Sequence, residues 1–177
     1  MKQKGLMAVV VLLCLLLTGC STSSTCTPVT VGSGIYEGCL PVAQQDFQTL
    51  HKKGIRAVLS LETLYYHTAP ERELAQRNGI KFYNAPICPS VVPPTERQVK
   101  RALLILNDPT LRPIFVHCLV GDDRTTFLIG LYRMYYQHWT PQAAWDEMRR
   151  NGFHARWWLY GLETYFWHHT QTPAWAK

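Results

Sequence analysis

A strand, a short loop and a helix follow one another without a spare residue in the second half of the chain. The run "RPIFVHC" (112–118) is β-branched and aromatic, which suits a buried central strand. The run "TFLIGLYRMYY" (126–136) is apolar on nearly every side, which is typical of a helix buried inside a domain. Both elements need covering layers, so this unit predicts an α/β domain in which the helix begins beside residues 118–124.

Shorter strand and helix patterns alternate before this unit. We expect a helix from about Val42 to Lys53 that ends at Gly54, and a helix that ends before Gly79. The expected strands are 34–38, 55–61 and 80–84. This alternation, with 47% hydrophobic residues in a chain of 177, predicts a single α/β domain with a central, mainly parallel sheet flanked by helices.

Three sequence signals predict where helices begin. Two capping-box patterns and one Thr-Pro pair occupy favoured first positions, at Thr68 with Glu71, Thr95 with Gln98, and Thr140 with Pro141. Val99, Leu103 and Leu106 repeat on one face of the second of these helices. The third helix is expected to end at Gly152.

The loop between the central strand and its helix has the features of an anion site. It contains Gly121, and successive backbone N–H groups converge where a loop enters a helix N-terminus. The positive electrostatic field of these N–H groups and of the helix dipole should favour the thiolate form of Cys118. Arg124 offers a planar fork for two phosphate oxygens. A nucleophile at the base of such a site indicates attack on phosphorus through a cysteinyl-phosphate intermediate.

No metal or other cofactor is expected for this chemistry. Arg124 and the backbone donors would supply the charge stabilisation. The sequence has no cluster with convincing metal-ligand spacing, since His168 and His169 are adjacent and lack evident partners.

The stretch "HCLVGDDRT" (117–125) resembles the active-site loop of the cysteine-based tyrosine phosphatases, in particular the compact dual-specificity type with HCxxGxxR followed by Ser or Thr. The similarity extends from about Gly34 to His169 and includes the approach "PPTERQV" and "PIFVHC". It implies the fold of that family and the hydrolysis of phosphomonoesters. The substrate implied is phosphotyrosine in proteins, together with phosphoserine or phosphothreonine.

The resemblance also implies a role for individual residues. Cys118 would be the nucleophile and Arg124 the phosphate clamp, while Leu119, Val120, Gly121, Asp122, Asp123 and Arg124 would offer backbone N–H donors. His117 would orient the loop and hold the thiolate from behind. Thr125 would place its hydroxyl near the sulfur and help it leave during hydrolysis.

The general acid departs from the family pattern. The family brings an aspartate from the loop before the preceding helix, but here that loop, "APICPSVVPPTE" (85–96), has no Asp. Glu96 is one candidate, although an acid in the first turn of a helix is already explained by the helix dipole. Asp123 is the other candidate, because it precedes Arg124 and would line the pocket mouth. The alternative role for Asp123 is to cap the helix while facing solvent. Asp122 is expected to face outward.

Two further departures bear on the substrate. Thr126 stands where the family commonly has Gly, and residues 119–123 contain no Lys. Two aspartates in the loop would repel additional phosphates, so a singly phosphorylated substrate is favoured. The alternatives are an inositol-phosphate or lipid phosphatase with the same loop, and a phosphate-binding pseudophosphatase. A rhodanese-like sulfur transferase is disfavoured, because its loop usually has a shorter Cys-to-Arg spacing.

The N-terminus has the pattern of an export signal. Lys2 and Lys4 precede the short apolar run 6–17, and "LTGC" (17–20) resembles a bacterial lipobox, which implies cleavage before Cys20 and lipidation of its thiol. Ser21 resembles sorting to the outer membrane. We therefore expect a lipid-anchored domain on the periplasmic side of a membrane, with an uncleaved anchor as the alternative. The expected divisions are a signal peptide (1–19), a tether (20–33), a phosphatase domain (34–170) and a tail (171–177).

Charge and cysteine content limit the partners. The formal charge of +6 falls to about +4 without Lys2 and Lys4, and no run of Lys or Arg predicts nucleic-acid binding.

Cys26 and Cys39 would form a disulfide or stay unmatched, and Cys88 would be a reversible partner of Cys118 or a small hydrophobic residue in its loop. The Trp- and Tyr-rich segment 155–169 would cover the core, with a membrane-surface belt as the alternative.

Overall fold

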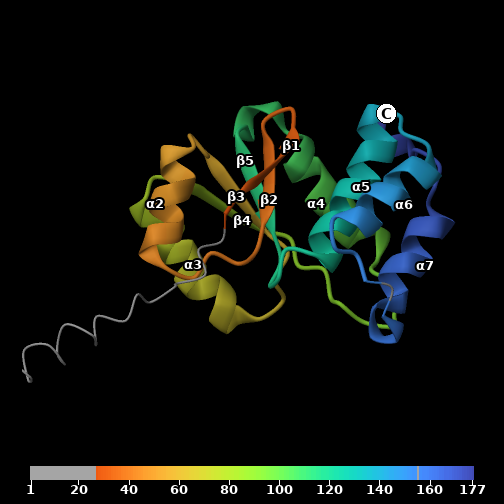
Figure 1. Cartoon of the computed structure of the whole chain (residues 1–177), viewed down its shortest axis with the longest axis horizontal. Coiled ribbons are helices and arrows are strands. Elements are labelled where there is room, and N and C mark those ends of the chain that lie inside the picture. Colours follow the sequence, from red (N-terminus) through yellow and green to blue (C-terminus); the bar gives the residue numbers. More distant parts are fainter. Residues whose placement is uncertain (1–26, 155) are drawn as a thin grey trace, which may run out of the picture.

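The computed structural model describes residues 27–154 and 156–177, and in this part of the chain a single sheet lies between two layers of helices (Figure 1). Its strands are β1 (Val29–Gly32), β2 (Ile35–Gly38), β3 (Ala57–Ser60), β4 (Lys81–Asn84) and β5 (Ile114–His117). Their order is β1-β2-β5-β3-β4, and β2, β5, β3 and β4 are parallel, whereas β1 is antiparallel at the edge. The predicted α/β fold with a mainly parallel sheet is confirmed.

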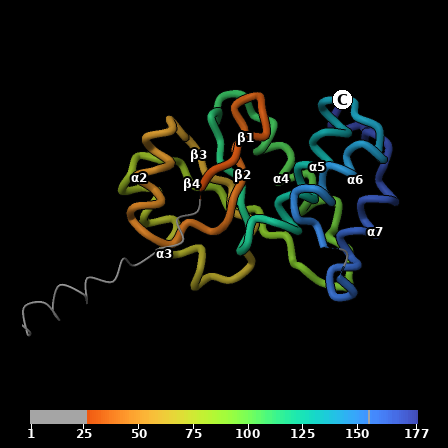
Figure 2. Tube along the Cα trace, in the orientation of Figure 1, coloured from red at the N-terminus to blue at the C-terminus, as the bar shows by residue number. Residues whose placement is uncertain are grey.

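The helices divide between the two faces of the sheet. One face is covered by α2 (Gln44–Lys52) and α3 (Tyr65–Arg77), and the other by α4 (Glu96–Asn107), α5 (Asp123–Gln137), α6 (Pro141–Arg150) and α7 (Tyr160–His168). Short 3-10 turns are η1 (Pro109–Leu111), η2 (Trp157–Leu159) and η3 (Ala174–Ala176). The Cα trace shows the later part of the chain returning to one side of the sheet (Figure 2). Across the described residues, no helix is both long and apolar enough to span a bilayer.

The alternation of side chains along the central strand β5 explains the two layers. Phe115 packs with the α2 and α3 side, while Ile114 and Val116 pack with α4 and α5. All three side chains are fully buried, and nearly every residue of α5 is buried as well. The predicted central strand and its all-round apolar helix are therefore confirmed, and they form the middle of the core.

Two predicted divisions of the chain are wrong at their boundaries. Residues 29–32, expected within the tether, form β1 and pair with β2. The hydroxyl-rich composition suggested a tether, but alternating β-branched residues before a Gly-Ser-Gly turn make a hairpin instead. The expected tail is also part of the domain, because Trp175 packs against the core and its indole contacts the ring of Tyr135. Cleavage and lipidation at Cys20 fall outside the described residues.

The helix starts were predicted with mixed success. Thr95 with Gln98 forms the expected capping box, and Thr140 accepts a hydrogen bond from the Ala143 N–H ahead of α6. The box predicted at Thr68 and Glu71 is wrong, because α3 begins earlier, at Tyr65, and both residues lie buried within it. Their side chains face inward, where Glu71 has polar partners in the sheet, so burial rather than capping explains the pair.

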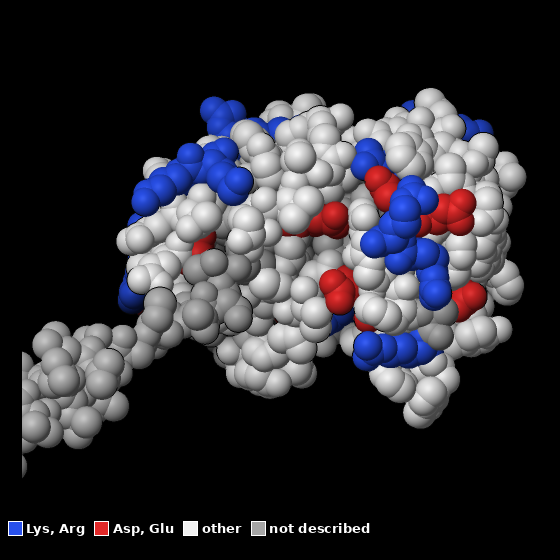
Figure 3. Space-filling view, in the orientation of Figure 1, with Lys and Arg blue, Asp and Glu red and all other residues white. Residues whose placement is uncertain are grey.

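Positive side chains form separate groups on one face of the described domain. On the face shown in Figure 3, Lys and Arg gather at the upper left and again over the helices at the right, with Asp and Glu between them. On this face, no single positive patch dominates the surface.

One buried carboxyl in the sheet predicts how stability depends on pH. Burial raises the pKa of Glu37 to about 7, and Glu147 adds to the rise. One oxygen of Glu37 is buried without a hydrogen-bond partner. In the folded protein the carboxyl therefore binds its proton more tightly than in the unfolded chain. The burial cost is absent below about pH 4.5 and fully present above about pH 7, so the free energy of unfolding should fall as the pH rises through this window.

Glu37→Gln is expected to remove most of this fall, because the amide stays neutral. The variant should become more stable than the wild type by about 2 kcal/mol at pH 8, with little difference at pH 4.5. Urea unfolding at pH 4.5, 6 and 8 measures the effect. Glu73→Gln is the matched control, because Glu73 is 62% exposed. Its free energy of unfolding should not diverge from that of the wild type as the pH rises. A constant difference for Glu37→Gln across the pH range would contradict the prediction.

Candidate active site

Cys118 lies at the carboxyl end of the central strand, where the chain leaves β5 and turns toward α5. Its side chain is only 3% exposed. Residues 118–122 form the loop between the two elements, and the N–H of Gly121 donates a hydrogen bond to the Cys118 sulfur over 3.4 Å. The loop thus folds back over the thiol.

Gly121 is required at its position by both conformation and space. Its φ is +94°, a region that other residues rarely adopt. A Cβ atom there would lie 2.6 Å from the carbonyl carbon and oxygen of Gly38, at the end of β2. The N–H of Leu40 also donates to the Leu119 carbonyl over 3.2 Å. The end of β2 therefore supports the loop from behind.

The Arg124 side chain is already held in place by the protein. It donates one hydrogen bond to the Glu62 carboxylate over 2.6 Å and one to the Leu61 carbonyl over 3.2 Å. Arg124 is 6% exposed and Glu62 2%, so this ion pair is buried. A guanidinium has five N–H donors in a planar fork, which leaves donors for an anion in the pocket.

Glu62 extends this contact to a third side chain. Its second oxygen lies 3.0 Å from Nδ1 of His67, a residue in the first turn of α3. The ring of Tyr66 packs edge-on against His67, with 4.2 Å between centroids. The orientation of Arg124 thus depends on the buried Glu62, whose contacts continue through the partly buried His67 to the start of α3.

His117 is fixed behind the loop by a second buried carboxylate. Its Nε2 lies 2.6 Å from Glu71, and its Nδ1 lies 3.0 Å from the carbonyl oxygen of Cys118. The Ser60 hydroxyl donates to the other oxygen of Glu71 over 2.9 Å. A carbonyl only accepts, so Nδ1 must carry a proton in this arrangement. All of these groups are buried, and the imidazole has a single orientation against the Cys118 backbone.

The two aspartates of the loop have different surroundings. Asp123 lines the pocket, and its Oδ1 accepts the N–H of His154 over 2.8 Å. Asp122 is half-buried beside Gly152 and is not among the residues that line the pocket. Burial and the neighbouring Asp123 both raise the pKa of Asp122. Asp123 therefore has access to a bound anion, whereas Asp122 packs against the turn after α6.

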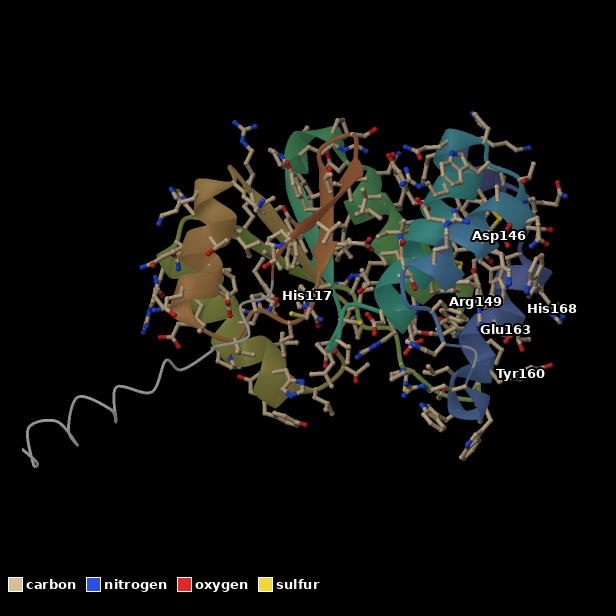
Figure 4. The ribbon with its side chains drawn as sticks, viewed as in Figure 1. His117, Asp146, Arg149, Tyr160, Glu163 and His168 are labelled. Carbon is tan, nitrogen blue, oxygen red and sulfur yellow. The ribbon has the colours of Figure 1, made fainter. Side chains whose placement is uncertain are left out.

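The pocket over Cys118 has a volume of about 170 Å³. It brings together five of the predicted site residues: Cys118, Leu119, Val120, Asp123 and Arg124. Pro89, Trp158 and Leu159 form the rest of its lining. Thr125 is fully buried, its hydroxyl has no hydrogen-bond partner in the described part of the chain, and it does not line the pocket. Figure 4 places His117 at the lower end of the sheet and Tyr160 at the start of α7.

The other candidate residues lie apart from this pocket. Glu96 accepts a hydrogen bond from the Trp175 indole N–H over 2.5 Å, is exposed, and does not line the pocket. Cys88 is exposed and free in the loop before Pro89. Cys39 is disulfide-bonded, and neither Cys88 nor Cys118 is its partner because both are free. The predicted pairing with Cys26 lies outside the described residues.

Sequence reasoning missed the two acidic residues that hold the site. Glu62 comes two residues after the end of the buried strand β3, and an acidic residue just beyond the carboxyl end of a parallel strand is a signal that points to a site. Glu71 shares an inward helix face with Thr68 and Ala75, at spacings of three and four residues. That spacing could have indicated a buried carboxylate, but it gives no information about the partner His117.

A larger hollow, of about 460 Å³, lies at the opposite end of the sheet. It is lined by His51, Arg56 and Lys81 among others. None of its lining residues is a cysteine. The smaller pocket holds the chemically active groups, so it is the better candidate for an active site.

Comparisons with known proteins agree with this geometry. A family model described as "Tyrosine phosphatase family" matches residues 26–157. The chain is 32% identical over 126 residues to the inositol diphosphatase SIW14 of Saccharomyces cerevisiae, which covers 67% of this chain and 43% of that protein. It is 44% identical over 41 residues to the dual specificity protein phosphatase TpbA of Pseudomonas aeruginosa, which covers 23% of this chain and 19% of that protein. Both matches span less than two thirds of the relative's length.

Solved structures show the same fold. The catalytic core of SIW14 with citrate superposes with a TM-score of 0.64 at 30% identity, covering 71% of this chain and 76% of that one. TpbA superposes with a TM-score of 0.67 at 20% identity, covering 84% and 88%. With the family match over residues 26–157, these similarities show that the chain belongs to the cysteine-based tyrosine phosphatase family.

Proposed function

We propose that this phosphatase hydrolyses phosphotyrosine in proteins, and also phosphoserine or phosphothreonine, with Cys118 as the nucleophile. The thiolate attacks phosphorus, a sulfur–phosphorus bond forms, and the bond from phosphorus to the leaving oxygen breaks. Water then attacks the cysteinyl-phosphate, which releases inorganic phosphate and restores the thiolate. The position of Cys118 under the Gly121 N–H and beside Arg124 supports this assignment.

Other residues of the loop would position the groups that react. Arg124 would use its remaining N–H donors on the phosphate oxygens while Glu62 and Leu61 hold the guanidinium. Backbone N–H groups of residues 119–124 would bind the same oxygens. His117, held by Glu71, would fix the Cys118 backbone from behind. The buried Thr125 hydroxyl, which has no partner, would stabilise the departing sulfur.

The lining of the pocket is the observation that carries the substrate assignment. Of the described residues that line it, Arg124 is the one cation, and Glu62 already pairs with it. Leu119, Val120 and Trp158 provide apolar and aromatic walls. A single phosphate on an aromatic ring fits such a lining better than a ring that carries many phosphates, which would need additional cations.

Hydrolysis of inositol phosphates or lipid phosphates is the second candidate. The relatives named inositol diphosphatases favour it, including one from Arabidopsis thaliana that is 32% identical over 126 residues and covers 68% of this chain and 60% of that protein. The loop 85–96 without an aspartate is also compatible with it, because a phosphate leaving group needs less protonation than an alkoxide. A phosphate-binding pseudophosphatase is the third candidate.

A substrate comparison under reducing conditions separates these candidates. The protein would be assayed for phosphate release from an aryl phosphate, phosphotyrosine and phosphoserine peptides, singly phosphorylated inositol lipids, and inositol phosphates with and without a diphosphate group. We expect the largest kcat/KM on the phosphotyrosine peptide. A larger value on an inositol diphosphate would replace the first candidate with the second. Absence of turnover on every substrate, with phosphate still bound, would favour the pseudophosphatase.

Asp123 is proposed as the general acid, and Asp123→Asn tests this role. The amide keeps the oxygen that accepts the His154 N–H but has no acidic proton to transfer. On a substrate with a poor leaving group, kcat should fall by about 10²-fold or more, with a much smaller loss on a nitrophenyl phosphate. Glu96→Gln is the matched control and should retain activity on both substrates. An equal loss on both substrates would contradict proton donation by Asp123.

We also propose that the protein is anchored by a lipid at Cys20 on the periplasmic side of a bacterial membrane. Ser21 favours the outer membrane. The lipobox "LTGC" (17–20) after a short apolar run supports this assignment. Mass spectrometry of the mature N-terminus tests it. A chain that begins at Met1, or at an unmodified Cys20, would contradict lipidation.

A further inference from the structure

Large hydrophobic side chains are exposed along the edge of the sheet at which the pocket opens. Of the fourteen that are exposed in the described part of the chain, nine lie in four short segments: 64–66, 91–92, 119–120 and 157–158. We name these nine residues the apolar rim. Tyr65 is 82% exposed and Trp157 76%. Scattered hydrophobic residues are normal on a protein surface, but a group of this size at one edge of a domain indicates a contact surface.

The topology explains why the four segments gather at one edge. Segments 64–66, 91–92 and 119–120 follow β3, β4 and β5, and the carboxyl ends of parallel strands meet at the same edge of the sheet. The segment 157–158 joins them because the N–H of Gly161 donates to the Ser90 carbonyl over 3.1 Å, and Trp158 lines the pocket. In Figure 1, α3 and the start of α7 lie on the lower side of the molecule, on either side of the loop after β5.

The described chain also begins at this edge. Because β1 is antiparallel to β2, Val29 pairs with Glu37, and the neighbouring Gly38 pairs with His117. The first residue of β1 therefore lies close to the end of β5 that precedes Cys118. The sequence before it contains the apolar run 6–17, and from Cys20 to Thr27 the chain reaches at most about 25 Å. An anchor in a bilayer, through this run or through a lipid on Cys20, would keep this edge close to the membrane surface.

The composition of the rim suits a bilayer surface. Trp and Tyr favour the interface between headgroups and acyl chains, where an apolar ring and a polar tip are both satisfied. Arg156 lies beside the rim, with its guanidinium 5.4 Å from the ring of Trp158, where it could meet a headgroup phosphate. We propose that the apolar rim rests on the bilayer that holds the anchor, so that the pocket opens toward phosphate groups presented at the membrane surface.

This proposal uses the anchor only for orientation and does not depend on which phosphate the pocket accepts. Tryptophan quenching tests it directly, because all six tryptophans lie between Trp139 and Trp175 and none lies in the N-terminal apolar run. The full chain would be incorporated into vesicles of phosphatidylethanolamine and phosphatidylglycerol, with or without lipids brominated near the headgroup. We expect the brominated lipids to quench part of the tryptophan fluorescence.

Two variants locate the quenched residue. The quenched fraction should fall by about half in Trp157→Phe, since Trp157 and Trp158 are the tryptophans of the rim. Trp167→Phe is the matched control: Trp167 is 38% exposed, lies near the other end of α7, and should leave the quenching unchanged. Phosphatase activity on a soluble aryl phosphate should be the same in all three proteins, which confirms that they are folded.

Two outcomes would overturn the proposal. Quenching that is absent, or equal in the wild type and Trp157→Phe, would show that the rim does not contact lipid. A dimer in detergent that dissociates on Tyr65→Ser, together with no quenching in vesicles, would assign the rim to a second copy of the chain instead.

Discussion

Cys118→Ser should reduce phosphate release from an aryl phosphate by at least about a thousandfold while leaving the fold intact. A serine hydroxyl is a far weaker nucleophile than a thiolate at neutral pH. The substitution removes little volume from a side chain that is 3% exposed, so the core should be unaffected. Steady-state turnover and thermal unfolding, measured on the same preparations, check both parts of the prediction.

The second free cysteine provides the control for this experiment. Cys88 is exposed in the loop 85–96 and does not line the pocket, so Cys88→Ser should keep the wild-type kcat. Undiminished turnover in Cys118→Ser would exclude the cysteinyl-phosphate route. Loss of activity in both variants would point instead to a chemical role shared by the two thiols.

Arg124→Lys is expected to lower kcat/KM by about 10²- to 10³-fold, although the positive charge is kept. Arg124 donates at the same time to Glu62, to Leu61 and, as we propose, to phosphate. An ammonium group has three donors on a flexible stem and cannot satisfy this planar arrangement. Kinetics on an aryl phosphate, with inhibition by inorganic phosphate or an analogue, would show whether binding, turnover or both are lost.

Arg133, which is partly buried, provides the control that separates the chemical effect of Arg124→Lys from the cost to stability of changing an arginine to lysine. Arg133 also forms a two-pronged ion pair, with both oxygens of Glu147 at 2.8 Å, but it lies on the side of α5 away from the pocket. Arg133→Lys should lower thermal stability and leave kcat near the wild-type value. A similar kinetic loss in both variants would mean that Arg124 acts through stability alone.

The fold was predictable from the sequence because its central unit is dominated by local pattern. The apolar strand 114–117 and the helix that follows it have periodicities that only burial explains, and both are buried as expected. The capping box at Thr95 was also predictable, since every contact that it makes lies within four residues. The strand pattern, the loop and the start of the helix were together enough to predict that Cys118 and Arg124 lie close together, and both line the same pocket.

The partners of these residues were not predictable, because they come from distant parts of the chain. Glu71 looked like half of a capping box, but its carboxylate meets His117, 46 positions away. Glu96 was a plausible acid until Trp175, 79 positions away, was seen to hold it outside the pocket. In each case a short local pattern had a second interpretation, and only the tertiary contact distinguished the two. The same holds for β1, whose pairing with β2 outweighed a composition typical of a tether.

The segment 60–71 has a consequence for anyone who moves this site to another protein. Ser60, Glu62, His67 and Glu71 all come from it, and together they hold both His117 and Arg124. A graft of the nine residues 117–125 onto a related scaffold would therefore carry the reactive groups without the carboxylates that orient them. The smallest transferable unit of this phosphatase consists of two segments that are far apart in sequence.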